Sequence, residues 1–367
     1  MYDYLIVGAG FSGVVLAERL ANGAKKKVCI IDKRNHIAGN AYDYYNNDNI
    51  LVHKFGPHWF HTNNDEVFNY LSNFTEWIEH QHIIKSKVNG KLYDFPINKN
   101  TINSFFNVSL TKEEEVKDFI DSKKEFIKNP KNAEEMVLSL LGKELYESFY
   151  LNYTIKQWNI HPKELAPSIT ARIPIRFNNN NSYFNDKYQV MPKIGYTKLF
   201  ERMLYNKNIT LLLNTDFKET FGTIKYNKLI YTGAIDEFFD NCFGELPYRS
   251  LKFEHETIDK EYFQECQQIN FPNDYSYTRI VEWKHATGQK LNKTSILKEY
   301  PVEYQKGLEK FYPIPMAESN ERLNKYLVKA KQINNVIFCG RLAEYKYYNM
   351  DQVIARSLKL FKDLTSK

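Results

Sequence analysis

The chain has 367 residues, which is long enough for two or three domains with well-buried cores. Its net charge of +6 is spread without a long basic block, so nucleic-acid binding and membrane binding have little support. The 4 cysteines lack metal-like spacing, and no apolar run reaches the roughly 18 residues of a membrane span. We therefore expect a cytoplasmic enzyme with reduced thiols, no bound metal and no targeting segment before its first strand.

The N-terminal segment has the pattern of a dinucleotide-binding unit. An apolar strand, a G-x-G-x-x-G turn, a helical run and a second strand follow one another, with the strands at residues 4–7 and 28–31. Gly8 permits a tight turn, Gly10 lets the backbone approach a pyrophosphate, and Gly13 lets the helix pack closely on the sheet. Asp32 then stands where a carboxylate accepts a hydrogen bond from a ribose hydroxyl. A glycine-rich turn without a ligand is the weaker interpretation, because the strand, helix and acid are all in register.

Asp32 also bears on the choice of cofactor. Its charge would repel a ribose 2′-phosphate, which disfavours NADP against NAD or FAD. The basic segment Lys33–Ala41 resembles the segment that wraps the ADP moiety in FAD enzymes of the glutathione-reductase class. This resemblance favours FAD, whereas the residues alone are equally consistent with a solvated basic loop.

Smaller elements interrupt this fold in the middle of the chain. A predicted strand at residues 50–55 runs into Gly56–Thr62, a loop with two histidines and two aromatic residues. Asn89-Gly90 between strand-like flanks predicts a type I′ hairpin. Apolar residues that recur at three and four positions over residues 116–127 and 137–153 predict a pair of amphipathic helices.

The second half begins with an irregular segment. Residues 158–185 are rich in proline and asparagine, which is more typical of a binding loop or lid than of a linker, with disorder as the alternative. Strands predicted at residues 209–213, 228–233 and 336–340 would rejoin the first sheet, as late strands do in doubly wound FAD proteins. A closing helix begins near Asp351 and places Met350, Asp351 and Gln352 at its positive end.

Six segments, in order along essentially the whole chain, resemble UDP-galactopyranose mutases of the bacterial type: Arg34–Tyr42, Gly56–Thr62, Tyr153–Trp158, Arg172–Phe177, Tyr277–Arg279 and Gly340–Tyr348. The resemblance implies an α/β fold, in which a Rossmann-like FAD-binding domain carries an inserted helical domain and an antiparallel sheet domain. The implied FAD-binding domain is discontinuous and comprises residues 1–80, 190–245 and 325–367. The helical domain comprises residues 98–165, and the substrate domain comprises residues 81–97, 166–189 and 246–324, with a mobile lid near 160–185.

The resemblance also implies an activity. The family interconverts UDP-galactopyranose and UDP-galactofuranose without net redox change and supplies furanose sugars for surface polysaccharide. In that family, N5 of reduced FAD attacks the anomeric carbon and expels UDP, and an iminium then opens the sugar ring, which recloses with a different size. The implied partners are a UDP-sugar and a second copy of the chain in a homodimer. No carboxylate pair of glycosidase type is evident, as expected if the flavin carries the chemistry.

Site residues follow from the same resemblance. Arg172, Arg279, Arg341 and His61 are expected to be catalytic. Arg172 and Arg279 match family arginines that bind the diphosphate leaving group, with the bidentate geometry that lysine lacks. Arg341 is expected to add positive charge near the flavin and sugar, and His61 to lie against the flavin. Substrate binding is expected of Tyr153, Trp158, Arg172, Tyr183, Asn270, Arg279, Tyr312, Tyr347, Asn349, His82, Trp59 and Phe60. FAD binding is expected of Gly8, Gly10, Phe11, Ser12, Gly13, Asp32, Lys33, Arg34, Gly39, Asn40, His58, His61, Thr232, Gly233, Gly340, Arg341, Met350, Asp351, Gln352 and Val353. Without the resemblance, Tyr153 is more simply a core aromatic residue. For His58, a structural histidine is as good an interpretation as a flavin contact.

Four positions depart from the common family pattern. Ala38 stands in place of a glycine, Trp59 of a smaller aliphatic residue, Asn349 of an aspartate and His82 of an asparagine. Trp59 and His82 would reshape the sugar end of the pocket, so UDP-N-acetylgalactosamine is a candidate second substrate.

Two other functional classes stay open at this point. They are an amine-oxidase-like FAD oxidoreductase and a non-catalytic nucleotide-binding protein. The oxidoreductase explains the N-terminal segment equally well, but not the arginines among tyrosines or the lid-like segment between them.

Overall fold

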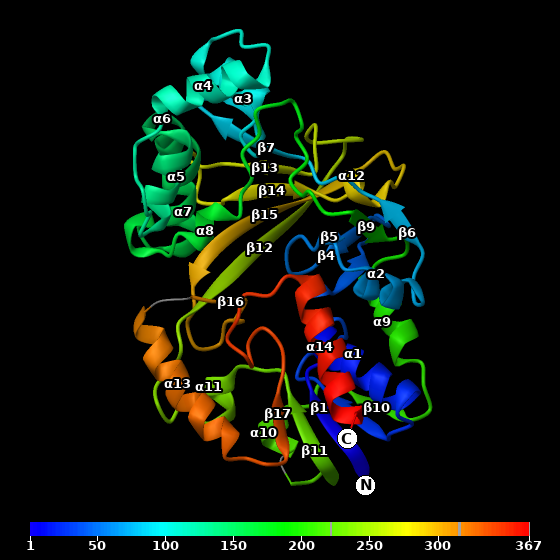
Figure 1. Cartoon of the computed structure of the whole chain (residues 1–367). Helices are drawn as coiled ribbons and strands as arrows, with labels where there is room; N and C mark the ends of the chain where they lie inside the picture. The colour runs from blue at the N-terminus through cyan, green and yellow to red at the C-terminus, as the bar shows by residue number, and fades with distance from the viewer. Residues whose placement is uncertain (221, 315–316, 367) are drawn as a thin grey trace.

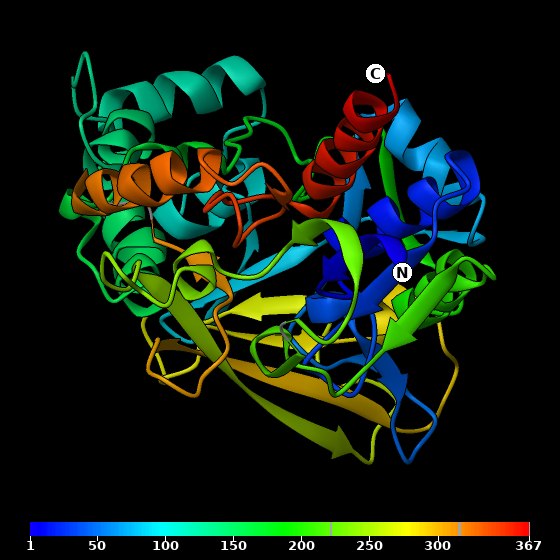
Figure 2. The same ribbon diagram turned by 90° about the horizontal axis from the view of Figure 1, so that it is seen from below.

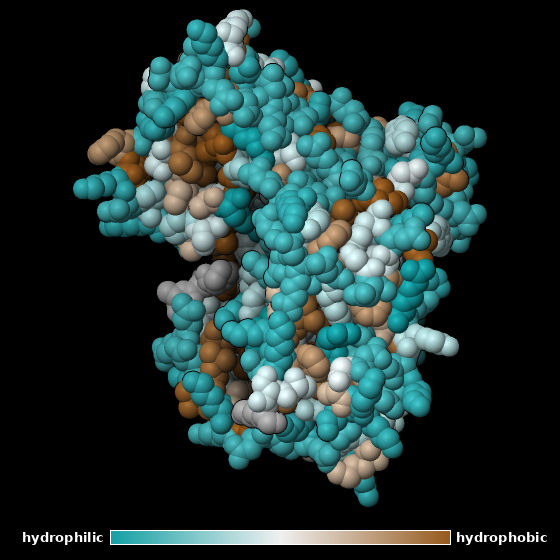
Figure 3. Space-filling view, turned by 45° about the vertical axis from the view of Figure 1, so that its right-hand side comes forward, coloured by the Kyte–Doolittle hydropathy of each residue, from teal (hydrophilic) through white to brown (hydrophobic). Residues whose placement is uncertain are grey.

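The computed structural model describes residues 1–220, 222–314 and 317–366. In Figure 1 the helical region and a parallel sheet lie at opposite ends of the molecule, with a larger sheet between them. The long strands of this larger sheet extend across the molecule, as Figure 2 also shows. Figure 3 shows a mostly polar face that is indented between the two ends. The predicted α/β architecture with helical and antiparallel parts is confirmed.

The parallel sheet has five strands in the order β10-β2-β1-β11-β17. Its strands are β1 Tyr2–Val7, β2 Val28–Ile31, β10 Ile209–Leu212, β11 Tyr226–Tyr231 and β17 Val336–Phe338. All four residues of β2 are buried, as expected for a strand that is covered on both faces of a parallel sheet. Two late strands, β10 and β11, therefore pair with strands of the N-terminal unit, and β17 joins the same sheet by pairing with β11.

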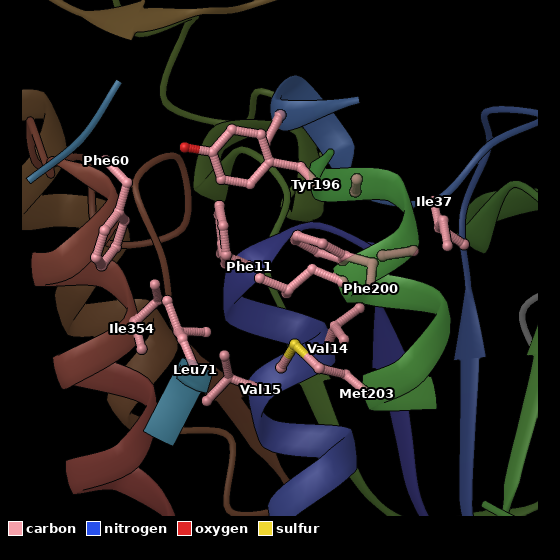
Figure 4. Close-up of a cluster of buried hydrophobic side chains, with 14 of the residues drawn as sticks. Phe11, Val14, Val15, Ile37, Phe60, Leu71, Tyr196, Phe200, Met203 and Ile354 are labelled. Carbon is pink, nitrogen blue, oxygen red and sulfur yellow. The ribbon is translucent and has the colours of Figure 1, made fainter. Parts of the chain in front are cut away.

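Helix α1 (Phe11–Glu18) lies between helices α9 (Tyr196–Leu204) and α14 (Met350–Thr365). Figure 4 shows Phe11 and Val14 of α1 against Phe200 and Met203 of α9, and Ile354 of α14 on the other side of α1. These residues are all buried. This packing fixes the glycine turn, because α1 starts directly after it.

The larger sheet has seven strands in the order β16-β12-β15-β14-β13-β7-β8, of which only β13 and β7 pair in parallel. Its strands are β7 Ile84–Val88, β8 Lys91–Phe95, β12 Tyr248–Ile258, β13 Gln268–Asn270, β14 Arg279–Glu282, β15 Thr294–Glu303 and β16 Tyr312–Pro313. Asn89 and Gly90 both have positive φ, 51° and 79°, as the predicted type I′ turn requires.

The helical region differs from the predicted pair of helices. Its helices are α3 Lys99–Phe106, α4 Glu113–Lys123, α5 Ala133–Leu141, α6 Lys143–Leu145, α7 Asn152–Trp158 and α8 Ser168–Ala171. The predicted stripe to residue 127 is wrong, because α4 ends at Lys123 and Phe126 is 95% exposed. The carbonyl of Lys123 lies where a Cβ on Gly142 would sit, so α4 ends where the chain passes the end of α5.

The remaining elements connect these parts. Short strands form a pair, β3 Asp43–Tyr45 and β4 Leu51–His53, and a three-stranded sheet, β5 Phe60–Thr62, β6 Trp77–Glu79 and β9 Tyr188–Pro192. The other helices are α2 Asp65–Ser72, α10 Phe217–Thr220, α11 Ile235–Phe238, α12 Lys284–Thr287 and α13 Ala317–Lys331. Shorter or wider helical turns are η1 Arg19–Gly23, η2 Gly39–Ala41, η3 Tyr146–Leu151 and η4 Pro162–Glu164. No helix in the described part of the chain is long and apolar enough to cross a membrane.

Candidate functional site

Two cavities meet in the interior of the molecule. The glycine cavity has a volume of about 400 Å³ and is lined by the turn after β1, the end of β2 and the turn after β11. The arginine cavity has a volume of about 600 Å³ and is lined by Arg172, Arg279 and Arg341 together with many aromatic residues. His58, Arg341 and Met350 line both cavities and mark where they meet.

The glycine turn forms a close-fitting cradle. Gly8 has φ +105°, and a Cβ on Gly13 would overlap the carbonyl oxygen of Gly8. A Cβ on Gly10, in contrast, would lie 3.7 Å from Gly39 Cα, at an ordinary contact distance. The eight-residue helix α1 starts here without a side-chain cap or an acidic residue in its first turn, so its free N–H groups suit an anion. These features fit a dinucleotide pyrophosphate.

Asp32 holds the turn in place. The residue is 9% exposed, and its carboxylate accepts hydrogen bonds from the N–H of Ala9 at 2.7 Å and the N–H of Arg34 at 2.9 Å. A carboxylate has further lone pairs for a ribose hydroxyl. The Arg34 guanidinium pairs with Glu309 at 2.9 Å, so the basic segment is anchored and is not simply a solvated loop.

Most of the residues expected to bind the cofactor line the glycine cavity. These are Gly8, Gly10, Phe11, Ser12, Asp32, Lys33, Arg34, Gly39, Asn40, His58, Thr232, Gly233, Arg341, Met350 and Val353. Gly13 and Gly340 lie behind the lining, where side chains would overlap Gly8 and Ser12. His61, Asp351 and Gln352 line the arginine cavity instead.

Arg279 enters the arginine cavity from the start of β14. Its Nη2 donates to Oε2 of Glu299 at 2.8 Å, and Glu299 lies directly opposite on β15 with 1% exposure. Burial alone would lower the pKa of the Arg279 guanidinium, but the Glu299 carboxylate raises it overall. Nε of Arg279 and Oε1 of Glu299 are buried without a hydrogen-bond partner in the described structure.

Arg172 and Arg341 flank a pair of tyrosines. The rings of Tyr312 and Tyr347 stack with centroids 5.4 Å apart, and the guanidinium carbon of Arg341 lies 5.1 Å from the Tyr312 ring centroid. The guanidinium carbon of Arg172 lies 5.1 Å from the Tyr347 ring centroid. Burial would raise the pKa of Tyr347, yet Arg172, Arg341 and Arg279 lower it below its ordinary value.

The two arginines keep their charge available to a ligand. Arg341 donates to the main-chain oxygens of Tyr348 and Phe311, and no carboxylate of the described residues forms an ion pair with Arg172 or Arg341. Together with Arg249, four arginines therefore line one cavity, and among the described residues only Arg279 of these four forms an ion pair, with Glu299. Such a cavity suits a diphosphate.

The other residues expected to bind substrate line the same cavity with one exception. Tyr153, Trp158, Tyr183, Asn270, Asn349, His82 and Trp59 are all in its wall. Phe60 is not, because strand alternation turns its ring into the core against Trp77, with centroids 5.4 Å apart. Burial raises the pKa of Tyr153 to about 12.

The two histidines of the Gly56–Thr62 loop have different surroundings. His58 Nδ1 bonds to the Gly56 oxygen at 3.0 Å, and burial lowers its pKa to about 4. His61 Nδ1 lies 3.0 Å from Oδ2 of Asp186. Glu299, Asp186 and Glu309 were not found from the sequence, because they belong to no motif and acquire their partners only through strand pairing and loop packing.

No group of three or more His, Cys, Asp or Glu residues in the described part of the chain could hold a metal ion. The profile of the UDP-galactopyranose mutase family matches residues 148–347, and that of the NAD(P)-binding Rossmann-like domain matches residues 6–74.

The chain is similar over most of its length to curated proteins. It is 40% identical to a probable UDP-galactopyranose mutase of Klebsiella pneumoniae, covering 99% of this chain and 95% of the relative. It is 36% identical to the dTDP-fucopyranose mutase of Escherichia coli, covering 98% and 97%.

Solved structures agree on the fold. A reduced UDP-galactopyranose mutase superposes with a TM-score of 0.78 at 14% identity, covering 100% of this chain and 94% of that one. A putrescine oxidase shares the fold at a lower TM-score of 0.62. The family profile and the full-length relatives together show that this chain belongs to the UDP-galactopyranose mutase family.

Proposed function

We propose that the protein interconverts UDP-galactopyranose and UDP-galactofuranose with FAD bound in the glycine cavity. The observation that carries this proposal is the convergence of Arg172, Arg279 and Arg341 on a cavity that meets the glycine cavity. When bound and reduced, FAD supplies a nucleophilic flavin N5 for covalent catalysis at the anomeric carbon, so that the reaction needs no net oxidant.

The arginines bind and stabilise the leaving group. As UDP departs, negative charge develops on its diphosphate, and Arg172 and Arg279 hold cationic donors toward it. Glu299 keeps the Arg279 guanidinium in one orientation through their 2.8 Å bond. Tyr183, Tyr312 and Tyr347 present hydroxyl groups in the same wall, where they donate to phosphate oxygens.

The ends of the arginine cavity bind the two other parts of the substrate. Tyr153 and Trp158, both on α7, provide aromatic surface for the uracil. Trp59, His82 and Asn270 face the sugar, and Asn349 lies close to the junction with the glycine cavity. His58, His61, Asp351 and Gln352 are proposed to contact the flavin end of the cofactor. The N-terminus of α14 at Met350–Asp351 favours negative charge on the nearby flavin.

The sugar and nucleotide preferences are open to test. The similarity to a dTDP-fucopyranose mutase favours dTDP-fucopyranose as a second candidate substrate. The departures at Trp59 and His82 favour UDP-N-acetylgalactosamine as a third. From the family we also propose a cytoplasmic homodimer that supplies furanose sugars for surface polysaccharide.

One experiment separates the functional classes. The purified flavoprotein is reduced with dithionite and incubated with UDP-galactofuranose, dTDP-fucopyranose or UDP-N-acetylgalactosamine, and the products are separated by chromatography. Ring-size exchange only in the reduced state, without substrate oxidation, supports the proposal. Oxygen uptake with stoichiometric substrate oxidation would instead indicate an oxidoreductase, and unchanged sugars would indicate a binding protein.

A further inference from the structure

His61 and Asp186 form a pair in the wall of the arginine cavity. Nδ1 of His61 lies 3.0 Å from Oδ2 of Asp186, and Asp186 Oδ1 accepts a second hydrogen bond from Nδ2 of Asn63 at 2.9 Å. The imidazole stacks on the Phe184 ring with centroids 3.6 Å apart and planes inclined by 14°. His61 also pairs with Gln189 between β5 and β9, so its ring is fixed on several sides.

This arrangement determines which nitrogen of His61 is free. An ionised carboxylate only accepts hydrogen bonds, so Nδ1 of His61 must carry the hydrogen that Asp186 accepts. In the neutral imidazole Nε2 then has a lone pair, and no described residue forms a hydrogen bond with it.

Changing the size of a sugar ring requires two proton movements. When the bond between C1 and O5 breaks, its electron pair stays on O5, which takes up a proton and becomes a hydroxyl. When O4 closes the new ring, its lone pair forms the bond to C1 and its hydroxyl proton leaves. One proton is gained and one is lost, so a single acid–base group can serve both steps.

The other polar residues of the cavity are less suited to this task. Arginine keeps its proton at all ordinary pH values, which excludes the four arginines of the wall, Arg172, Arg249, Arg279 and Arg341. His58 and His82 are buried without a carboxylate partner among the described residues, and burial lowers the pKa of both. His61 has both the carboxylate and a free nitrogen.

We propose that His61 carries this proton and that Asp186 positions it. As imidazolium, His61 donates from Nε2 to O5 when the C1–O5 bond breaks. As imidazole, it accepts the proton of the 4-hydroxyl when the O4–C1 bond forms, which restores its starting state. The inference rests on the proposed sugar-ring reaction. It makes His61 a catalytic residue and Asp186 a positioning residue.

The first test uses the protein without substrate. Nitrogen-15 NMR of histidine-labelled protein, with His61→Gln to assign the signal, should show neutral His61 with its hydrogen on Nδ1. Asp186→Asn should change this signal, because an amide that donates to Nδ1 favours the opposite tautomer. A hydrogen on Nε2 in the unmodified protein, or an unchanged signal in Asp186→Asn, would overturn the inference.

The second test follows two steps in the reduced holoprotein. Cleavage of the bond between the anomeric carbon and the diphosphate is measured by exchange of oxygen-18 from the bridging position into the phosphate, and ring contraction is measured by chromatography. His61→Gln should slow ring contraction by about 10²-fold or more while exchange continues. Asp186→Asn should slow it to a smaller extent, and Asp186→Glu should restore part of the rate.

Controls separate the possible failures. Asp65→Asn removes a carboxylate that pairs with Lys187 on the exposed surface nearby, and should leave both rates unchanged. Equal slowing of exchange and contraction, or unchanged contraction in His61→Gln, would overturn the proton-transfer role alone. Absence of both processes in the unmodified protein would instead overturn the proposed function.

Discussion

The glycine cavity and the arginine cavity share three lining residues but are built from different parts of the chain. The glycine cavity is shaped largely by backbone from short segments, in which the absence of side chains creates the space. The arginine cavity is formed by long side chains from α7, α8, β14, β16 and the loops around them. The glycine cavity should therefore lose its shape when a methyl group is added. The arginine cavity should lose its function when a charge or a hydrogen-bond donor is moved.

Gly13→Ala should have the largest effect on the protein as a whole. The new methyl group overlaps the backbone oxygen of Gly8, which cannot move without shifting β1 or α1. We expect a loss of about 3 kcal/mol or more in the free energy of unfolding, measured with urea on FAD-free protein.

Gly10→Ala is the matched control for this change. Its methyl group would lie 3.7 Å from Gly39 Cα, without overlap, so FAD-free protein should lose less than about 0.5 kcal/mol. FAD affinity should nevertheless fall, because the pyrophosphate approaches the backbone at this residue. Equal loss of stability in both variants would contradict this division, in which Gly13 is needed for packing and Gly10 for the approach of the pyrophosphate.

Arg279→Lys should have the largest effect on turnover through the arginine cavity. Lysine keeps the charge but loses the planar fork that reaches both Glu299 and a phosphate oxygen. We expect kcat to fall by about 10²–10³-fold with little change in melting temperature. Arg172→Lys should act similarly, and wild-type turnover in either variant would refute the diphosphate role.

Lys156 connects the two walls that bind the nucleotide. Its ammonium lies within hydrogen-bond distance of four main-chain oxygens of the loop 271–277, which leads into Arg279, while Lys156 itself lies on α7 with Tyr153. Burial lowers its pKa from 10.5 to about 8, although Asp274 acts in the opposite direction. Above this pH one donor is lost, at about 1 kcal/mol, so KM should rise roughly fivefold.

The pH dependence of stability distinguishes the loss of the Lys156 contact from general unfolding. The unfolded lysine keeps its proton up to pH 10.5, whereas the folded one loses it near pH 8, so this group makes unfolding less favourable as pH rises between these values. KM should therefore increase while stability does not fall through Lys156. Lys156→Gln should have a raised KM at all pH values, and Lys143→Gln, at an exposed lysine, should behave as wild type.

Features that depend only on the local spacing of residues could be predicted from the sequence. The glycine turn and the type I′ hairpin depend on local chain geometry, and the structure has them as predicted. It also places Asp32 in the wall of the glycine cavity, directly after β2. Phe60 was misplaced although strand alternation could have shown that it faces away from Trp59 and His61. The helix end at Lys123 was missed because the apolar period continues past it.

Other features depend on register and could not be read from the sequence. Glu299 faces Arg279 only because β14 and β15 pair in one particular alignment, which the intervening loop sets. Asp186 reaches His61 through the packing of an irregular segment beside β5. Neither carboxylate has a neighbouring motif that reveals its partner.

His82→Asn should change sugar selection by a smaller amount. His82 Nδ1 is buried in the cavity wall without a hydrogen-bond partner, so it favours a sugar that can bond to it. We expect the ratio of kcat/KM for UDP-N-acetylgalactosamine and UDP-galactopyranose to change roughly tenfold, about 1.4 kcal/mol. His80→Asn is the control, because His80 Nε2 is also buried without a partner in the described structure but does not line the cavity. The same change in both variants would place the effect in packing.

Ala38→Gly should have the smallest effect. Among the described residues that line the glycine cavity, Ala38 is the one non-glycine residue with a positive φ. Ala38 has φ +71° and ψ 0°, the left-handed region, which costs a residue with a Cβ about 1–2 kcal/mol. Glycine removes this cost but loses up to about 1 kcal/mol more conformational entropy on folding. We expect a net gain of less than about 1 kcal/mol in the free energy of unfolding by urea, with Ala21→Gly inside the buried helical segment losing stability instead. A loss in Ala38→Gly would mean that its methyl group contributes packing that exceeds the backbone strain, and the glycine cavity would then depend on a side chain as the arginine cavity does.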